Sequence, residues 1–352
     1  MSGTAHDGFD TGRLLDVTDL SVYFPGRRRQ APVRAVDGVS FSIARGETLG
    51  LIGESGSGKS TVGKAVVGLI RPRAGSVSLK GVETRRLSRR EKRLHEQAVQ
   101  IVFQDPSEAL DPRMTITASI GEPLRRRALR GSRDEREERV REVLERVGLD
   151  AAYGRRHPHE LSGGQRQRVN IARALVSQPE LVICDEAVSA LDVSVQAGIL
   201  NLLAELKAEQ DLSYLFISHD LGVVANVADR ITVMYLGRVI ETAVTENIIN
   251  RPAHPYTHAL LAAEPQALPR RLRRQGRDVL KGDIPSPADP PSGCRFRTRC
   301  RYAEKRCAAE EPQFRQLTPG HWVACHFAED IGRSRAASGL DHTRTIPENR
   351  RT

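Results

Sequence analysis

The sequence predicts an α/β fold built on a mainly parallel sheet, and three observations support this. Short apolar runs alternate along the chain with amphipathic helical stretches, which is typical of parallel strands with helices on both faces. One run, at residues 47–52, leads through a glycine-rich turn into a helix. Polar side chains follow several runs directly, at the strand ends where such sheets bind ligands. The length of 352 residues allows one large domain and a smaller appendage.

The expected elements of the first half of the chain follow in order. Residues 1–12 are small and polar, and we predict that they are disordered. The basic run at 85–93 is expected to be a solvated helix face, and 116–148 has helical patterning with ion pairs at i,i+4 spacing. Strands are expected at 14–22, at 33–43 as a strand pair, at 76–79 as a short edge strand, and at 97–103.

The second half continues the alternation and then changes character. Helices are expected at 166–175 and 194–208, strands at 181–184 and 214–218, and a closing hairpin at 231–235 and 238–242. Beyond residue 265 the chain becomes arginine-rich at 269–277 and proline-rich at 283–293, and four cysteines follow. The polar tail from 331 is expected to be disordered.

Charge and hydropathy restrict the possible functions. The formal net charge is +10, which suits nucleic acid or an anionic membrane face without choosing between them. Aromatic residues make up only 4% of the chain, which disfavours a stacking platform for single-stranded nucleic acid. No run approaches the roughly 20 apolar residues of a membrane span, and no signal-peptide core is present. We therefore expect a cytoplasmic protein whose membrane role, if any, is peripheral.

The glycine-rich turn at residues 53–61, called the phosphate loop below, fits the pattern G-x-x-x-x-G-K-[ST]. Its glycines let backbone N–H groups point at phosphate oxygens, and the helix that follows adds its positive dipole end. Lys59 is expected to reach the β- and γ-phosphates, and Ser60 to bind Mg²⁺. A flexible Gly/Ser loop is the alternative, which the strand–turn–helix context disfavours. The expected nucleotide-binding residues here are Gly53, Ser55, Gly56, Ser57, Gly58, Lys59, Ser60 and Thr61.

Four further side chains at strand ends are candidates for catalysis. Asp185 and Glu186 follow a buried strand, so Asp185 is suited to Mg²⁺ and Glu186 to polarising an attacking water as general base. An N-cap and a surface charge would be the ordinary roles of such a pair. His219 ends the next strand and is expected to contact the γ-phosphate, although a structural histidine is common there. Gln104 could reach Mg²⁺ and the water, and is ambiguous alone.

The combination resembles the ATP-binding subunits of ABC transporters over residues 13–265. The motifs occur in the family's order: Walker A at 53–61, the Q-loop at Gln104, the LSGGQ signature at 161–165, Walker B at 181–186, the D-loop at 189–192 and the H-loop at His219. One departure is Ala187, where the family usually has proline. The resemblance implies a P-loop NTPase fold with a mixed core sheet, an antiparallel β subdomain and a helical subdomain at about 106–178. It also implies an aromatic residue stacked on adenine, with Phe24 the first candidate and Tyr23 its rival.

The same resemblance implies a dimer. In this family the signature of one subunit covers the nucleotide held by another, so a chain with one set of motifs needs a second ATPase subunit, identical or related. The residues expected to bind the facing nucleotide are Ser162, Gly163, Gly164 and Gln165.

Flanking segments narrow the resemblance to the oligopeptide/dipeptide importer branch. They are residues 102–106, 110–114, 185–195, 217–224, 254–261 and 282–327. The branch implies ATP-driven peptide uptake at the cytoplasmic face of the membrane, with two permease subunits and an extracytoplasmic solute-binding protein as partners. Nickel and glutathione importers have similar ATPases and remain alternatives. A soluble ABC-type ATPase acting on nucleic acid or ribosomes is the rival of another class, and we expect no nucleic acid partner.

The four cysteines are assigned to a C-terminal domain at residues 266–330. Reducing conditions disfavour disulfides, and four clustered thiolates suit a metal centre, but their spacing fits neither common zinc pairs nor ferredoxin runs. Zinc, an iron–sulfur cluster and plain structural cysteines stay open on spacing alone; the resemblance favours a structural 4Fe–4S cluster. Neighbouring arginines would offset its charge. His321 and His326 are possible substitute ligands, with structural roles as the alternative. The proposed cluster ligands are Cys294, Cys300, Cys307 and Cys325.

Overall fold

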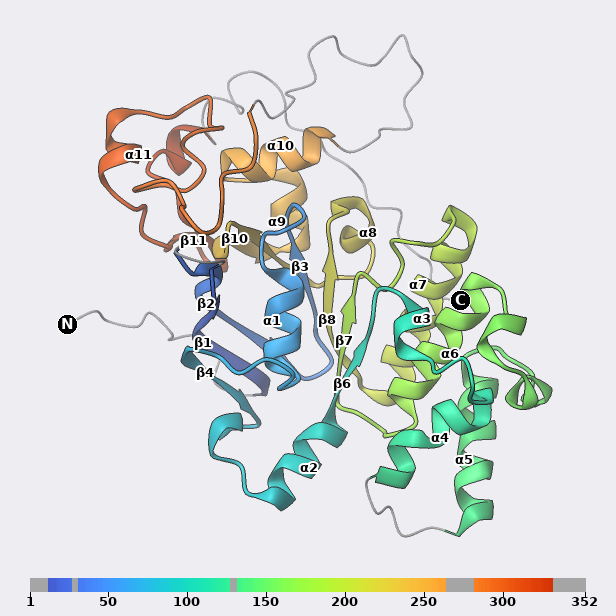
Figure 1. Cartoon of the computed structure of the whole chain (residues 1–352). Helices are drawn as coiled ribbons and strands as arrows, with labels where there is room; N and C mark the ends of the chain where they lie inside the picture. The colour runs from blue at the N-terminus through green and yellow to red at the C-terminus, as the bar shows by residue number, and fades with distance from the viewer. Residues whose placement is uncertain (1–11, 27–30, 127–131, 264–281, 332–352) are drawn as a thin grey trace, which may run out of the picture.

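Two sheets form the body of the molecule (Figure 1). The structure is a computed structural model that describes residues 12–26, 31–126, 132–263 and 282–331. The larger sheet has the strand order β11-β12-β10-β9-β3-β8-β7-β6, and the smaller one has the order β2-β1-β4-β5. Apart from Gly12 and Ile331, the residues of both predicted disordered ends lie outside the described ranges, as do the linker at 269–277 and the boundary at 265–266.

The centre of the larger sheet is parallel. β3 pairs in parallel with β8 and β9, and β7 and β6 continue the parallel part beyond β8. Every residue of β3, β7 and β8 is buried, as expected for strands covered on both faces. The strands of this part are β3 (Thr48–Ile52), β6 (Val99–Val102), β7 (Leu181–Asp185), β8 (Ser213–Ser218) and β9 (Arg230–Tyr235).

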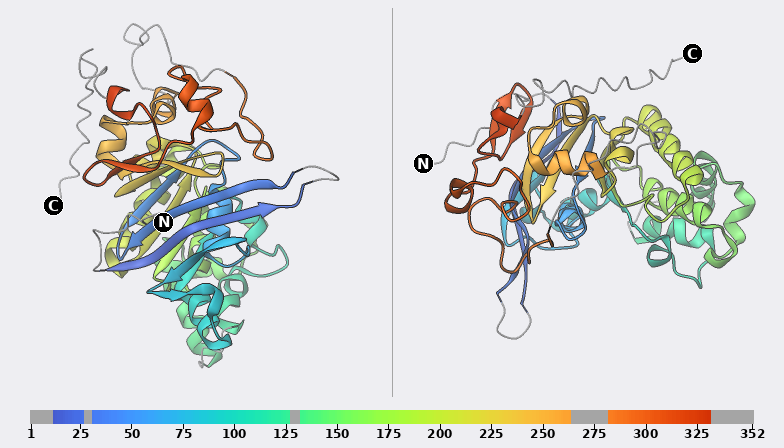
Figure 2. Two further views of the ribbon diagram at one scale, coloured as in Figure 1. Left: turned by 90° about the vertical axis from the view of Figure 1, so that its left-hand side faces the viewer. Right: turned by 90° about the horizontal axis from the view of Figure 1, so that it is seen from above.

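The smaller sheet is antiparallel, and it corrects two predictions: the stretch at 76–79 is not an edge strand, because it is paired on both sides, and the stretch at 33–43 is not a strand pair. Its strands are β1 (Arg13–Phe24), β2 (Val33–Ala44), β4 (Ala74–Leu79) and β5 (Val82–Glu83). The region at 33–43 is one long strand and not a strand pair, because it stays paired with β1 from Val33 to Ala44 and passes Gly38 through a register shift instead of a turn. Figure 2 shows β1 and β2 side by side as a long ribbon.

Helix α1 (Lys59–Val66) lies between the two sheets and contacts β1, β2, β7 and β8. Its Val62, Ala65 and Val66 belong to a hydrophobic core shared with both sheets. The first helix after the phosphate loop is therefore fixed on two sides by buried apolar contacts.

A helical group stands beside β6 (Figure 2, right) and confirms the helical patterning predicted there. It contains α3 (Pro106–Ala109), α4 (Ile116–Arg126), α5 (Arg133–Arg146) and α6 (Gly163–Leu175). Residues 127–131, inside the predicted helical stretch, lie outside the described ranges. The basic run at 85–93 begins in a short 3₁₀ helix (Thr84–Arg86) and enters an α-helix at Arg89, where Ser88 caps α2 (Arg89–Ala98) with a capping box. Two further helices, α7 (Val193–Gln210) and α8 (Leu221–Ala225), follow β7 and β8.

The C-terminal region extends the larger sheet instead of standing apart from it. The predicted hairpin is present as β9 and β10 (Arg238–Val244), but it does not close the sheet, because β12 (His321–Val323) pairs with β10 and β11 (Arg315–Thr318) pairs with β12. This pairing covers the backbone groups that an open edge would expose. Helices α9 (Thr245–Asn250) and α10 (Pro255–Ala263) follow β10 and still belong to residues 13–265, whereas α11 (Lys305–Ala309) belongs to the C-terminal region. Among the described helices, none is long and apolar enough to span a bilayer.

Candidate functional site

Four neighbouring strands end at the edge of the sheet where the candidate residues gather. β3, β8, β7 and β6 are adjacent and parallel (Figure 1), so their carboxyl ends share one edge. The phosphate loop follows β3, His219 follows β8, and Asp185 ends β7 just before Glu186. The candidate side chains therefore lie at one sheet edge, as their positions after buried strands predict, and their roles as ligands stay predictions.

The phosphate loop has the backbone shape that its glycines predict. Gly58 has φ 102, and a Cβ atom there would lie 2.1 Å from the carbonyl oxygen of Ala35, so a larger residue would force the loop away. Ser57 N–H donates to the carbonyl of Glu54 at 3.1 Å within the loop. Gly237 N–H donates to the carbonyl of Ser57 at 2.9 Å, which ties the loop to the turn between β9 and β10.

Lys59 is held where an anion is expected. The residue is only 4% exposed, and its Nζ donates to the carbonyl oxygens of Gly53 at 2.7 Å and of Glu54 at 3.0 Å. Burial lowers the pKa of Lys59, while the carboxylates of Glu186 and Asp185 oppose that shift. A triphosphate in the loop would offer this buried ammonium stronger, charged acceptors than the two carbonyls.

Ser60 and Asp185 form the expected magnesium pair. Ser60 Oγ donates to Asp185 Oδ1 at 2.7 Å. Asp185 is 5% exposed, and burial raises the pKa of its carboxyl against the opposing hydrogen bond from Ser60. A buried carboxylate beside a hydroxyl is a donor set that fits Mg²⁺. Gln104 is exposed and lies two residues after Val102, the last residue of β6. Val102 pairs with Cys184 of β7, and Glu186 lies two residues after Cys184. Gln104 and Glu186 therefore occupy matching positions after neighbouring strands.

Glu186 and His219 meet at the same edge. The Nδ1 of His219 lies 3.4 Å from Oε2 of Glu186, and the Glu186 side chain is 14% exposed whereas His219 is open to solvent. Glu186 has φ 50, in the left-handed region, and its N–H donates to the carbonyl of Ile217 at 3.0 Å. A half-enclosed carboxylate oriented by a histidine is suited to accept a proton from water.

The signature residues form the capped start of helix α6. Ser162 caps α6, its Oγ accepting from Gln165 N–H, while Gln165 Oε1 accepts from Ser162 N–H at 2.9 Å. Gln165 Nε2 also donates to Tyr153 Oη at 3.1 Å. Within the described part of the chain, Ser162 makes no hydrogen bond to its own phosphate loop.

The two aromatic candidates differ in their surroundings. Tyr23 Oη donates to Asp37 at 2.6 Å, and the guanidinium groups of Arg34 and Arg73 lie 5.9 and 5.1 Å from its ring centre. Phe24 is 40% exposed. The Tyr23 ring thus already contacts two guanidinium groups, whereas the Phe24 ring is exposed to solvent.

The four C-terminal cysteines line one cavity of about 10 Å³, and none of them is in a disulfide. That volume is roughly the space of one water molecule, so a 4Fe–4S cluster does not fit without outward movement of the thiols. Burial raises the pKa of Cys294 to about 11 and of Cys325 to about 12. No group of three or more His, Cys, Asp or Glu side chains in the described ranges is arranged to hold a metal ion. Cys184 lies apart, buried in β7.

Two of the arginines beside the cysteines were expected to offset the charge of a cluster, but they form ion pairs with carboxylates elsewhere. Arg295 pairs with Asp37, and Arg299 forms a two-pronged ion pair with Glu54 of the phosphate loop. The two candidate histidines have structural partners: His321 is buried against Glu241, and His326 bonds to the carbonyl of Glu310. Glu54 was missed because it fills a variable position of the motif, which carries no signal by itself.

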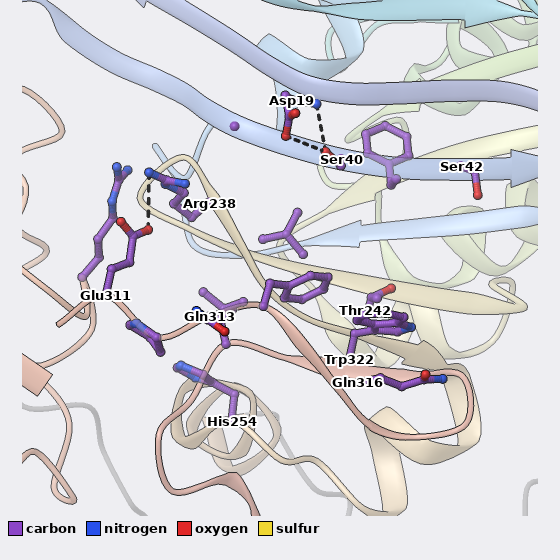
Figure 3. A pocket seen from close by; sticks show the side chains of 18 of the residues that line it. Asp19, Ser40, Ser42, Arg238, Thr242, His254, Glu311, Gln313, Gln316 and Trp322 are labelled. Atoms are coloured by element: carbon purple, nitrogen blue, oxygen red, sulfur yellow. Dashed lines mark hydrogen bonds and ion pairs between the residues drawn. The ribbon is translucent and has the colours of Figure 1, made fainter. Parts of the chain in front are cut away.

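A large pocket of about 860 Å³ lies elsewhere, between β2, β10 and the C-terminal strands (Figure 3). Arg238 and Glu311 form an ion pair of 3.3 Å across it, and Phe314 stacks on Trp322 with ring centres 6.1 Å apart. None of the described residues that line it belongs to the phosphate loop. The pocket is therefore separate from the candidate nucleotide site.

Comparisons with known proteins agree with this geometry. Residues 36–189 match the family model described as ABC transporter, and residues 240–307 match the one described as oligopeptide/dipeptide transporter, C-terminal region. The chain is 48% identical to the oligopeptide transport ATP-binding protein AppF of Bacillus subtilis, with 89% of this chain and 97% of the relative covered. It is 44% identical to the oligopeptide transport ATP-binding protein OppF of Haemophilus influenzae, with 89% and 96% covered.

Solved structures give the same result. The ATP-binding cassette MJ0796, a dimer in a post-hydrolysis state with ADP and phosphate, matches with a TM-score of 0.60 and 29% identity over 66% of this chain and 99% of that one. The cbiO1 protein of Clostridium perfringens matches with a TM-score of 0.60 and 28% identity over 68% and 92%. The predicted ABC-type α/β fold is confirmed. The chain thus belongs to the ABC transporter family, as an ATPase subunit that carries the oligopeptide/dipeptide transporter C-terminal region.

Proposed function

We propose that this ATPase subunit energises the uptake of di- and oligopeptides across the cytoplasmic membrane. The observation that carries the proposal is the joint presence of the Lys59, Ser60–Asp185 and Glu186–His219 contacts at one sheet edge in a chain whose relatives are named oligopeptide transport ATP-binding proteins. The matching C-terminal region supports the importer branch.

The described contacts support a proposed role in hydrolysis for each of these residues. Lys59 would exchange its two loop carbonyls for phosphate oxygens, and Glu186 would take the proton of the attacking water. His219 would orient the Glu186 carboxylate and contact the γ-phosphate. Ser60, Asp185 and Gln104 would hold Mg²⁺, which when bound neutralises charge on the β- and γ-phosphates.

A second ATPase subunit, identical or related, would complete the site. The start of α6, with Ser162, Gly163, Gly164 and Gln165, would offer its serine hydroxyl, its glycine N–H groups and its positive dipole end to a γ-phosphate held by the facing subunit. The dimeric MJ0796 cassette supports such an assembly. The further partners would be two permease subunits, which hold the pair at the cytoplasmic face of the membrane, and an extracytoplasmic solute-binding protein.

The open Phe24 ring is proposed to stack on adenine in preference to Tyr23. Tyr23 would have to give up its hydrogen bond to Asp37 or its neighbouring arginines before a base could lie on it. Phe24 needs no such exchange.

Reconstitution tests the proposed function. The subunit would be placed in proteoliposomes with its permeases and solute-binding protein, and ATP-dependent accumulation of labelled di- and oligopeptides would be measured. Peptide uptake that stops without ATP is expected. Hydrolysis with uptake of nickel or glutathione but not peptides would contradict the peptide assignment. Tight, salt-sensitive binding of RNA or DNA with no transport would favour the rival class.

We also propose that Cys294, Cys300, Cys307 and Cys325 hold an inorganic centre, a 4Fe–4S cluster with zinc as the alternative. Support comes from the four reduced thiols that line one cavity. The raised pKa values of Cys294 and Cys325 mean that metal binding must release protons from these two thiols, so metal content should rise with pH. A 4Fe–4S cluster would require a larger outward movement of the thiols than a zinc ion would.

Elemental analysis of anaerobically purified protein decides between the centres. About four iron atoms per chain with matching sulfide are expected for the cluster, and about one zinc for the alternative. C300S/C307S should lose the metal, whereas C184S should keep it, because Cys184 is buried in β7. Wild-type protein with neither metal would contradict both.

A further inference from the structure

Residues 294–300, called the cysteine segment below, touch the nucleotide site through two arginines on either side of one aromatic anchor. Phe296 is buried, with ring centres 5.2 Å from Tyr235 and 5.4 Å from Tyr256. Arg295 and Arg299 flank this anchor. Since Phe296 fixes the segment against β9 and α10, both guanidinium groups are held in place on the ATPase part.

Arg299 grips the phosphate loop. Its two terminal nitrogens donate to the two carboxylate oxygens of Glu54 at 2.6 and 3.0 Å, and the Arg299 side chain is only 6% exposed. Tyr256 Oη accepts the backbone N–H of the same Glu54 at 2.8 Å. Glu54 is thereby held by its side chain and by its backbone, next to the carbonyl that binds Lys59.

Arg295 makes a second, parallel contact. Its guanidinium donates to Asp37 and to the carbonyl of Leu236. Asp37 N–H donates to the carbonyl of Gly237 at 2.9 Å, and Gly237 N–H in turn donates to the carbonyl of Ser57 in the phosphate loop. The cysteine segment thus reaches the phosphate loop at two points, directly at Glu54 and through one turn at Ser57.

We infer that Arg299 is a positioning residue of the ATP site, which neutralises Glu54 and holds the phosphate loop in the shape that accepts a triphosphate. The inference rests on the proposed binding of ATP at this loop. Its physical reason is charge: the Glu54 carboxylate acts electrostatically on Lys59 and stands in a loop built for phosphates. Without Arg299, that carboxylate would repel the triphosphate and compete for Lys59.

The experiment measures the Kd of a fluorescent ATP analogue with Mg²⁺ on the full-length chain. R299M removes the charge and keeps the length of the side chain, and we expect about tenfold weaker binding, within the usual range of coupling between neighbouring groups. R299K keeps the charge without the fork and should fall between R299M and wild type. R297M is the matched control, because Arg297 in the same segment bonds to Ser292 instead of the phosphate loop, and it should bind as wild type does.

A double-mutant comparison distinguishes an effect of R299M that acts through the charge of Glu54 from a general disturbance of the fold. E54Q removes the repelling carboxylate, so E54Q and E54Q/R299M should both bind within about threefold of wild type. Normal binding by R299M, or E54Q/R299M as weak as R299M alone, would overturn the inference. If thermal melting shows that R299M is unfolded, two other comparisons of Kd test the inference. R299K should bind the ATP analogue more weakly than wild type, and E54Q/R299M should bind it as E54Q does. A wild-type chain that binds no nucleotide would instead contradict the proposed function.

Discussion

Glu186 shows how a single backbone angle serves the site. At φ 50 a residue with a side chain costs about 1–3 kcal/mol, so the surrounding contacts must hold it there. The carbonyl of Ile217 accepts its N–H, and Ser189 donates its backbone N–H and its hydroxyl to the Glu186 carbonyl. The result is a carboxylate turned out of the sheet edge and toward His219.

Glu186→Gln is the prediction at this scale. The amide keeps the size of the side chain but cannot accept the proton of water, so hydrolysis should fall about 10²- to 10⁴-fold while ATP binding persists. Closed dimers should accumulate, which size-exclusion chromatography with ATP would detect. Glu209→Gln, at an exposed position of α7, should hydrolyse ATP normally. Normal turnover by Glu186→Gln would remove Glu186 from its role as base.

At the scale of the element, the start of α6 combines a stabilising cap with a proposed binding surface. The capping box of Ser162 and Gln165 satisfies N–H groups that the first helical turn leaves without partners. Helix α5 begins with the same device, formed by Ser132 and Glu135. The two helix starts are chemically alike, but only that of α6 belongs to the signature.

Ser162→Ala therefore has a matched control in Ser132→Ala. Each should lose about 1 kcal/mol of stability through its cap, visible as similar shifts in thermal melting. Only Ser162→Ala should slow ATP hydrolysis by the assembled transporter, by about 10- to 100-fold, since a hydrogen bond to a charged group is worth about 1.5–3 kcal/mol. Equal activities of the two variants would contradict contact between Ser162 and the facing nucleotide.

At the scale of the whole molecule, one buried carboxylate joins the C-terminal region to the ATPase part. Glu241 of β10 accepts hydrogen bonds from the N–H groups of Ala253 and His254, from the Thr257 hydroxyl and from His321 of β12. Burial alone would raise the pKa of Glu241, but the hydrogen bonds from His321 and Thr257 hold it below its usual value. The negative charge is thus part of the junction.

Glu241→Gln should destabilise the protein by roughly 3 kcal/mol at pH 7, because an amide brings its own donors to a site already full of them. The lowered pKa of Glu241 gives stability that is present above pH 4.5 and lost as pH falls through the folded value. Glu241→Gln should therefore be less sensitive to acid below pH 4.5. Urea unfolding at several pH values measures both effects. Glu310→Gln removes only an exposed ion-pair partner of Arg306, so its free energy of unfolding should match that of wild type. A Glu241→Gln variant as stable as wild type would contradict the proposed role of Glu241 in the junction.

The phosphate loop, the strand-end acids and the signature were predictable because each is a contiguous motif tied to a local structure. Periodicity likewise located the parallel strands and most helices. It failed at 33–43, where only pairing with β1 keeps the chain extended past Gly38. It also could not show that β12 joins β10, since that pairing brings together segments about 80 residues apart.

By itself the sequence located the side chains of the proposed nucleotide site, because the loop residues and the residues proposed to bind metal and to act as base stand at short spacings after buried strands. Only the tertiary structure decided what the arginines beside the cysteines do. A guanidinium pairs with whichever carboxylate the fold brings within reach, and the partner of Arg299 is Glu54, 245 positions away along the chain. Contacts of that kind depend on packing between segments that are distant in the sequence, so no local sequence pattern predicts them.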